Sequence, residues 1–143
     1  MRLILIVPAA LALACGPAGI AAEAPAQAPN SVSTPIVRAA HTLSGQPLHL
    51  PQGSAEMVAA AVDIPAGGST NIHQHPWSRF VYVERGPLRI VNEDTRQVHV
   101  LQTGQAFGEV VAQWHQGFAP GPNGARVITI DLVPPGQSNM VMR

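Results

Sequence analysis

Lysine is absent from this sequence of 143 residues, and all eight of its basic residues are arginines. Without a lysine amine, neither Schiff-base catalysis nor a phosphate loop that depends on lysine is available. Charged residues make up only 11% of the chain, and the eight basic residues are matched by eight acidic ones. This balance offers no basic surface for a nucleic acid, so we expect a small-molecule ligand or substrate as the partner.

Cysteine is almost as scarce, because Cys15 is its only copy. One cysteine allows neither a disulfide within the chain nor a cluster of thiolate ligands. The sequence also lacks a serine nucleophile elbow and paired carboxylates, so a hydrolase function has no support. Hydrophobic residues make up 46% of the chain. That content and length are typical of one globular domain with a sizeable core.

The first residues have the pattern of a secretory signal. Met1 and Arg2 precede an apolar run, residues 3–14, that is too short to span a bilayer. The small residues Ala21 and Ala22 stand where a signal peptidase would cleave. The pattern therefore predicts a signal peptide over residues 1–22, export to the periplasm and no transmembrane span. Alternatively, the Ala-Leu-Ala-Cys sequence that ends at Cys15 resembles a bacterial lipobox, and Cys15 would then carry a lipid anchor.

Residues 23–35 are rich in alanine and proline without periodic apolar positions, which predicts a solvated linker. From residue 36 to 143, short apolar runs alternate with turn-forming glycine, proline and asparagine. This alternation is typical of an all-β sandwich or barrel. The expected strands are 57–64, 79–84, 88–91, 97–101, 106–111 and 126–133. The alanine-rich start of the first run also fits a helix, but it lacks helix caps, so we interpret it as a strand.

The only close histidine pair lies in the middle of this domain. His73 and His75 are two residues apart, so they share one face if the segment is extended. Two imidazoles on one face indicate a metal site. The same pair also fits two polar residues on a strand, so a third ligand is needed to distinguish the two interpretations.

The spacing around this pair resembles the first motif of the cupin superfamily of small β-barrels. That motif has a glycine, five residues, His-x-His, three or four residues, a glutamate, six residues and a glycine. In this sequence Gly67, His73, His75 and Gly86 match it. Arg79 stands at the position of the glutamate.

The second cupin motif is matched in part. Gly104 and His115 stand where the motif has its first glycine and its histidine. Val110, Ala112 and Ala119 replace its proline, second glycine and asparagine. The resemblance extends over residues 43–136, nearly the whole domain. It does not by itself specify a function, because cupins include oxygenases, isomerases, decarboxylases, storage proteins and sensor domains.

The resemblance implies a double-stranded β-helix, or jelly-roll barrel, with one divalent transition metal in its mouth. The ligands would be His73, His75 and His115, with positions left open for water or a substrate. Three imidazoles suit iron, manganese, zinc or nickel, and the sequence does not select among them.

Arg79 is the departure that matters most for this site, because a guanidinium cannot coordinate a metal and stays protonated. At ~4 Å and an effective dielectric constant near 20, its charge would repel a divalent ion by roughly 8 kcal/mol. Three arrangements avoid this. A bulge could turn Arg79 outward, an internal carboxylate such as Glu109 could neutralise it, or it could bind an anionic substrate. Thiol dioxygenases, which are cupins, combine three histidines with such an arginine.

Two functional hypotheses follow. The first is an exported metal enzyme of oxygenase or isomerase type, with a dioxygenase among the candidates, in which Arg79 orients a small anion and Glu109 acts as acid or base. The second is a non-catalytic binding or sensor cupin with a modified or lost metal site.

Cupins often dimerise across an open sheet edge, so we also expect a homodimer, with residues 36–50 as a candidate edge.

Overall fold

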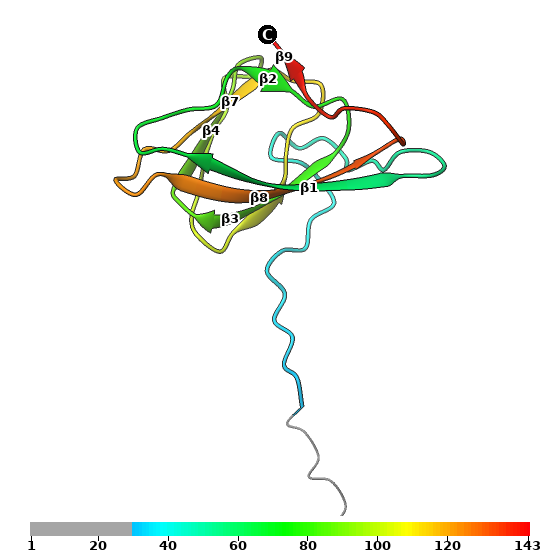
Figure 1. The fold of residues 1–143 in the computed structure, drawn as a ribbon, viewed down its shortest axis with the longest axis horizontal. Helices are drawn as coiled ribbons and strands as arrows, with labels where there is room; N and C mark the ends of the chain where they lie inside the picture. The colour runs from blue at the N-terminus through cyan, green and yellow to red at the C-terminus, as the bar shows by residue number, and fades with distance from the viewer. Residues whose placement is uncertain (1–29) are drawn as a thin grey trace, which may run out of the picture. The chain divides into compact units, whose positions relative to one another are not determined.

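The computed structural model describes residues 30–143 (Figure 1). The predicted signal peptide, Cys15 and most of the predicted linker therefore lie outside the described residues. Residues Ser33–Arg143 form one compact unit. The described part of the chain contains no helix with the length and apolar character of a membrane span.

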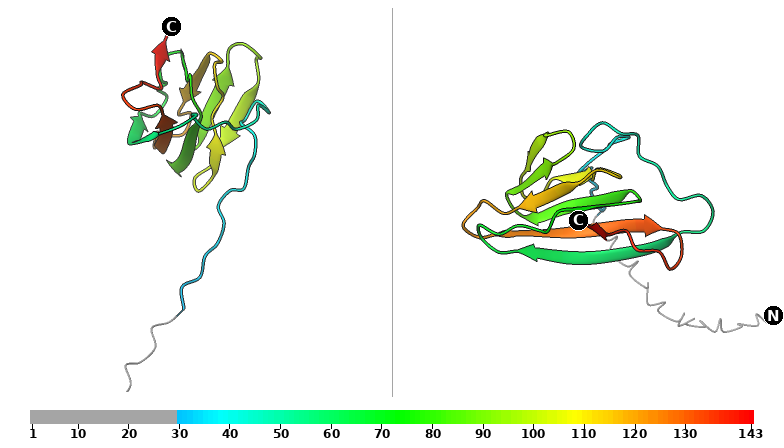
Figure 2. Two further views of the ribbon diagram at one scale, coloured as in Figure 1. Left: turned by 90° about the vertical axis from the view of Figure 1, so that its right-hand side faces the viewer. Right: turned by 90° about the horizontal axis from the view of Figure 1, so that it is seen from above.

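Two antiparallel sheets make up this unit, and their strands form two layers in Figures 1 and 2. In one sheet the order is β1-β8-β3-β6, and in the other it is β5-β4-β7-β2-β9. The strands are β1 (Glu56–Ile64), β2 (His73–Gln74), β3 (Arg79–Arg85), β4 (Leu88–Asn92), β5 (Val98–Leu101), β6 (Ala106–Gly108), β7 (His115–Phe118), β8 (Ala125–Val133) and β9 (Val141–Met142). The all-β jelly-roll prediction is confirmed.

Alternating burial explains why β8 forms where it does. Along β8, every second side chain from Ala125 to Val133 is buried, as expected for a strand with one face on the core. β1 pairs with β8 over all nine residues, and the two lie side by side in Figure 2. Between the layers lies an apolar core, mostly aliphatic with one aromatic ring: Ile64, Val81, Val83, Leu88, Ile90, Phe107, Ala119, Ala125 and Val127.

The sequence did not predict three short strands, β2, β7 and β9. β2 and β9 contain two residues each, and β7 is the polar sequence His-Gln-Gly-Phe. Their extended form depends on pairing with neighbours rather than on an apolar pattern. The expected strand over residues 106–111 also ends early, at Gly108.

The segment over residues 36–50 does not form a regular edge strand. It bonds to its own subunit, since the Leu43 N–H donates to the Gly108 carbonyl at 3.0 Å. The Leu48 N–H donates to the Ala40 carbonyl at 2.9 Å. The long open edge of the first sheet is β1, which pairs only with β8 in the described part of the chain.

Candidate metal centre

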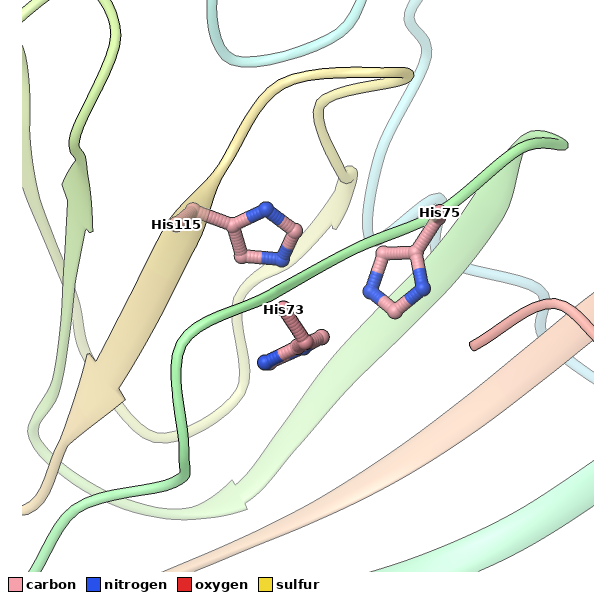
Figure 3. Close-up of side chains that lie close together, drawn as sticks. All are labelled: His73, His75 and His115. Atoms are coloured by element: carbon pink, nitrogen blue, oxygen red, sulfur yellow. The ribbon is translucent and has the colours of Figure 1, made fainter. Parts of the chain in front are cut away.

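Three histidines from two neighbouring strands meet between the sheets. His73 begins β2 and lies directly opposite His115, the first residue of β7. His75 comes directly after the end of β2, and all three side chains are buried. One ring nitrogen from each lies within 4.8 Å of the others. Figure 3 shows the three rings turned toward a common centre.

Backbone carbonyls fix which nitrogen of each ring faces that centre. The Nδ1 atoms of His73, His75 and His115 lie 2.8, 2.6 and 2.8 Å from the carbonyl oxygens of residues 71, 139 and 113. A carbonyl oxygen only accepts a hydrogen bond, so each Nδ1 carries the proton. The neutral ring then presents its Nε2 lone pair, which is the arrangement that metal-binding histidines adopt.

The Nε2 atoms of His75 and His115 are buried and have no hydrogen-bond partner among residues 30–143. A buried polar atom without a partner loses its hydration with no compensation. A divalent ion held by the three Nε2 atoms would supply that compensation. The three histidines therefore fit a transition metal by tautomer, by burial and by convergence.

The buried position of its ring also favours the neutral form of His73 in the metal-free protein. Burial lowers the pKa of His73 to about 4, against a weaker opposing effect of its bond to Asn71. Burial also opposes charge on His115, but contacts with Glu109 outweigh it and raise the pKa of His115. At neutral pH His73 thus keeps its lone pair for a metal.

Glu109 places a carboxylate beside two of the imidazoles. Its oxygens lie 3.3 Å from His75 Nε2 and 3.4 Å from His115 Nε2. Burial alone would raise the pKa of Glu109, yet contacts with His115 and His75 hold it well below its ordinary value. The carboxylate is therefore ionised at neutral pH and offers a negative charge at the centre.

Arg79 points inward but its charge is already balanced. Its Nε and Nη2 atoms each donate a 2.7 Å hydrogen bond to one carboxylate oxygen of Asp131. Both side chains are nearly buried, at 10% and 8% exposure. Nη1 has no hydrogen-bond partner within residues 30–143. The internal carboxylate that neutralises Arg79 is thus Asp131, whereas Glu109 faces the histidines.

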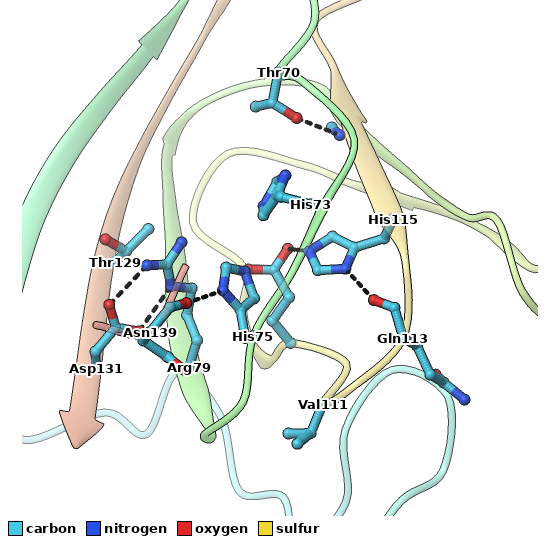
Figure 4. A network of polar contacts seen from close by, with 12 residues as sticks. Thr70, His73, His75, Arg79, Val111, Gln113, His115, Thr129, Asp131 and Asn139 are labelled. Atoms are coloured by element: carbon cyan, nitrogen blue, oxygen red, sulfur yellow. Dashed lines mark hydrogen bonds and ion pairs between the residues drawn. The ribbon is translucent and has the colours of Figure 1, made fainter. Parts of the chain in front are cut away.

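Asn139 connects this ion pair to the histidines. Its side-chain amide donates to Asp131 at 2.7 Å, and its backbone carbonyl accepts the His75 Nδ1 hydrogen bond. Its side-chain oxygen also accepts the Trp77 backbone N–H at 2.8 Å. Figure 4 shows Asn139 between Asp131 and His75. The chain of bonds from Arg79 therefore orients the His75 ring.

A cavity of about 130 Å³ opens beside this centre. Its polar lining includes His73, Arg79 and Glu109. Most of the remaining wall is apolar, with side chains that include Val62, Ile64, Val81, Ile90, Val127 and Met140. A cavity with apolar walls and a few convergent polar groups is typical of a small-molecule site.

All five residues that the sequence analysis selected as ligands or catalytic groups lie at or beside the centre, and the structure adds Asp131 and Asn139. Asp131 had a detectable signal, because it occupies an inward position of an apolar strand. Asn139 had none, since it follows a Pro-Pro-Gly turn and is defined only by its tertiary contacts.

Comparison with known proteins places the chain in a family. Residues 60–131, just over half of the chain, match the family model described as Cupin domain. The chain belongs to the cupin family. No curated protein matches the sequence of this cupin significantly.

Among solved structures, this cupin is similar to a polyketide cyclase from Streptomyces resistomycificus, with 20% identity and a TM-score of 0.52 over 76% of this chain and 78% of that one. It is similar to a DMSP lyase from Ruegeria pomeroyi, with 18% identity and a TM-score of 0.52 over 62% of this chain and 44% of the other. An oxalate decarboxylase from Lactobacillus farciminis also matches, with 20% identity and a TM-score of 0.52 over 60% of this chain.

This cupin spans only 26% of the length of that decarboxylase. At identities this low, the three likenesses show a shared fold and nothing about activity. The predicted membership of the cupin superfamily is confirmed, and a metal site at its three histidines is consistent with the family.

Proposed function

We propose that this cupin is an exported protein that binds one divalent transition metal through His73, His75 and His115 and acts on a small anionic molecule. One observation carries the proposal: three buried imidazoles hold their Nδ1 protons on backbone carbonyls and turn Nε2 toward a common centre. When bound, the metal would supply Lewis-acid or redox chemistry of the oxygenase or isomerase type.

Charge balance supports an anionic ligand. Arg79 and Asp131 cancel each other, the three neutral imidazoles add nothing, and Glu109 contributes one negative charge. With a divalent ion the centre keeps a net charge of +1, which a singly charged anion would neutralise in this buried place. Arg79 could orient such an anion through Nη1, because Asp131 occupies only Nε and Nη2.

The apolar wall supports a ligand with a hydrocarbon part. We therefore expect the metal-loaded protein to be stabilised against heat by short carboxylates such as butyrate and much less by the amides of equal length. Thermal unfolding in the two series measures this, and equal stabilisation would contradict an anionic ligand.

Metal binding is tested by the metal content of the purified protein. After incubation with iron, manganese, zinc or nickel and removal of free ions, we expect one equivalent in the wild type and almost none in the His73→Ala/His75→Ala variant. The matched control is His41→Ala/His49→Ala, because both of these histidines are exposed and lie outside the centre. A wild-type protein without metal under every condition would refute the proposal.

A non-catalytic binding or sensor role is the second candidate, and the bidentate Arg79–Asp131 pair favours it. An arginine whose Nε and Nη2 already bind a carboxylate has fewer free donors and less uncompensated charge for an anionic substrate. Stable binding of an anion without turnover would identify a binding protein.

Export remains a proposal as well, and the mass of the mature N-terminal peptide distinguishes cleavage after Ala22 from a lipidated Cys15.

A further inference from the structure

Glu109 has a place in this centre that the three histidines do not explain. It directly follows β6, it is only 6% exposed, and its carboxylate contacts His75 and His115 rather than a basic residue. A buried carboxylate is costly unless a cation or several donors compensate it. No arginine side chain bonds to it within residues 30–143.

The distances at Glu109 suit a shared ion better than a hydrogen bond. Its contacts of 3.3 and 3.4 Å to the two Nε2 atoms exceed the roughly 2.7–2.9 Å of a charge-assisted hydrogen bond. Two ligands bound tetrahedrally to one zinc-sized ion, at about 2.1 Å each, lie about 3.4 Å apart. The carboxylate and the two imidazoles are thus spaced as ligands of a common ion.

Strand register explains why the carboxylate comes from this position. Phe80 pairs with Gly108 between β3 and β6, and the Glu109 N–H donates to the Arg79 carbonyl at 2.8 Å. Glu109 therefore stands opposite Arg79 on one side. Asp131 stands opposite Arg79 on the other side, in β8.

Residues directly opposite each other in an antiparallel pair project from the same face of the sheet. Asp131, Arg79 and Glu109 thus form a row of three charged side chains on the inner face. Because Asp131 binds the guanidinium with both oxygens, Glu109 remains available to the centre. The negative charge at the histidines comes from the neighbour of Arg79 across the sheet.

We propose that Glu109 is the fourth protein ligand of the metal, supplied from the end of β6. This inference rests on the proposed binding of a metal by the three histidines. It assigns Glu109 to the ion itself, in place of the acid or base role expected from the sequence. A carboxylate oxygen added to three nitrogens lowers the charge of the centre and suits manganese or iron as well as zinc.

The test compares metal-stripped wild type, Glu109→Gln, Glu109→His and the control Glu84→Gln, using Co²⁺ as a spectroscopic probe and Mn²⁺ as a second ion. Glutamine keeps the shape of the side chain but removes its charge, so we expect the Kd for Co²⁺ to rise at least about 10-fold and the visible absorption bands to change. Glu84 is half-exposed and bound to Arg126, so Glu84→Gln should leave both unchanged.

Glu109→His separates coordination from charge, because an imidazole lacks the negative charge of the carboxylate but can still coordinate a metal. We expect it to bind Co²⁺ more tightly than Glu109→Gln and with a spectrum of its own, which a purely structural role would not produce. If the wild type binds Co²⁺ and Glu109→Gln has the same Kd and spectrum, the inference is wrong while the proposed function stands. If the wild type binds neither ion, the proposed function itself fails.

Discussion

At residue 79, a guanidinium lies beside three imidazoles, and its surroundings decide what it can do. Asp131 accepts two hydrogen bonds from it. Asn139 in turn donates to Asp131 through its side chain and accepts the His75 Nδ1 hydrogen bond through its backbone carbonyl. Arg79 therefore acts as a positioning residue for the centre in addition to any contact with an anion. A bond that holds a metal-binding imidazole in one orientation commonly affects metal affinity 10- to 100-fold.

Removing the carboxylate of Asp131 should destabilise the protein strongly. In Asp131→Asn the Arg79 charge stays buried without a counter-charge, and we expect the free energy of unfolding to fall by about 3 kcal/mol. Urea denaturation of the metal-free proteins measures it. Asp63→Asn is the matched control, because Asp63 also pairs with arginines but is 55% exposed, and this change should have little effect. Equal losses in both variants would contradict the buried-pair argument.

The difference in the free energy of unfolding between wild type and Asp131→Asn should also depend on pH. Burial by itself would raise the pKa of Asp131, but bonds from Arg79 and Asn139 lower it overall, below the ordinary 3.8. A carboxyl whose pKa is depressed by folding contributes its full stabilisation above the unfolded value and loses it as the pH falls through the folded value. The gap between the two urea midpoints should therefore be constant above about pH 5 and shrink below pH 3.8. A gap that widens in acid would refute this assignment.

At the scale of the elements, apolar runs between turn signals identified six strands and missed β2, β7 and β9. The run at residues 126–133 became β8, whose alternate side chains cover the core, and the run at 57–64 became β1, which pairs with β8 along its whole length although only Ile64 is buried. β2 and β7 contain His73 and His115, and such polar residues weaken the apolar pattern on which a strand prediction depends. The strands that build the centre were therefore the hardest to predict.

The turn between β7 and β8 depends on Gly124, which lies against the end of β1. Its φ of +68° is in the left-handed region, and an added Cβ would lie 2.4 Å from the Ile64 carbonyl oxygen. Gly136 has a similar φ of +75° but open space around it. We expect Gly136→Ala to cost roughly 1–2 kcal/mol for the backbone conformation alone. Gly124→Ala should cost clearly more, because the turn must also move.

Urea denaturation of the two alanine variants tests this pair of expectations under identical conditions. The comparison separates backbone strain from close contact, since only Gly124 combines the two. Similar losses in both variants would mean that the Ile64 carbonyl moves aside at little cost.

At the scale of the whole molecule, β1 is the open edge of the first sheet. It presents apolar side chains to solvent, with Met57 67% and Val58 43% exposed. An exposed apolar edge strand commonly pairs with another chain. The homodimer expected from the sequence remains a prediction, and β1 is a better candidate for its interface than residues 36–50, which bond within their own subunit.

Sedimentation velocity tests this interface. We expect the wild type to sediment as a dimer and Met57→Glu to shift toward the monomer, because the new charge would be buried between subunits. Val98→Glu is the matched control, since Val98 is 54% exposed on β5, an edge strand of the other sheet. A monomeric wild type would refute the homodimer, and an unchanged Met57→Glu dimer would exclude this part of β1.

The sequence by itself determined the fold class, the histidine pair and its third partner His115, and the conflict that Arg79 creates. The fold class and the histidine pair follow from local spacing and periodicity, which decide the face on which a side chain lies. His115 and the conflict at Arg79 were implied by the resemblance to the cupin motifs. Only the tertiary structure decided that Asp131 neutralises Arg79 and that Glu109 faces the imidazoles. Which residue stands across from Arg79 depends on the register of β3 with β8 and β6. That register is set by contacts between residues far apart in the chain.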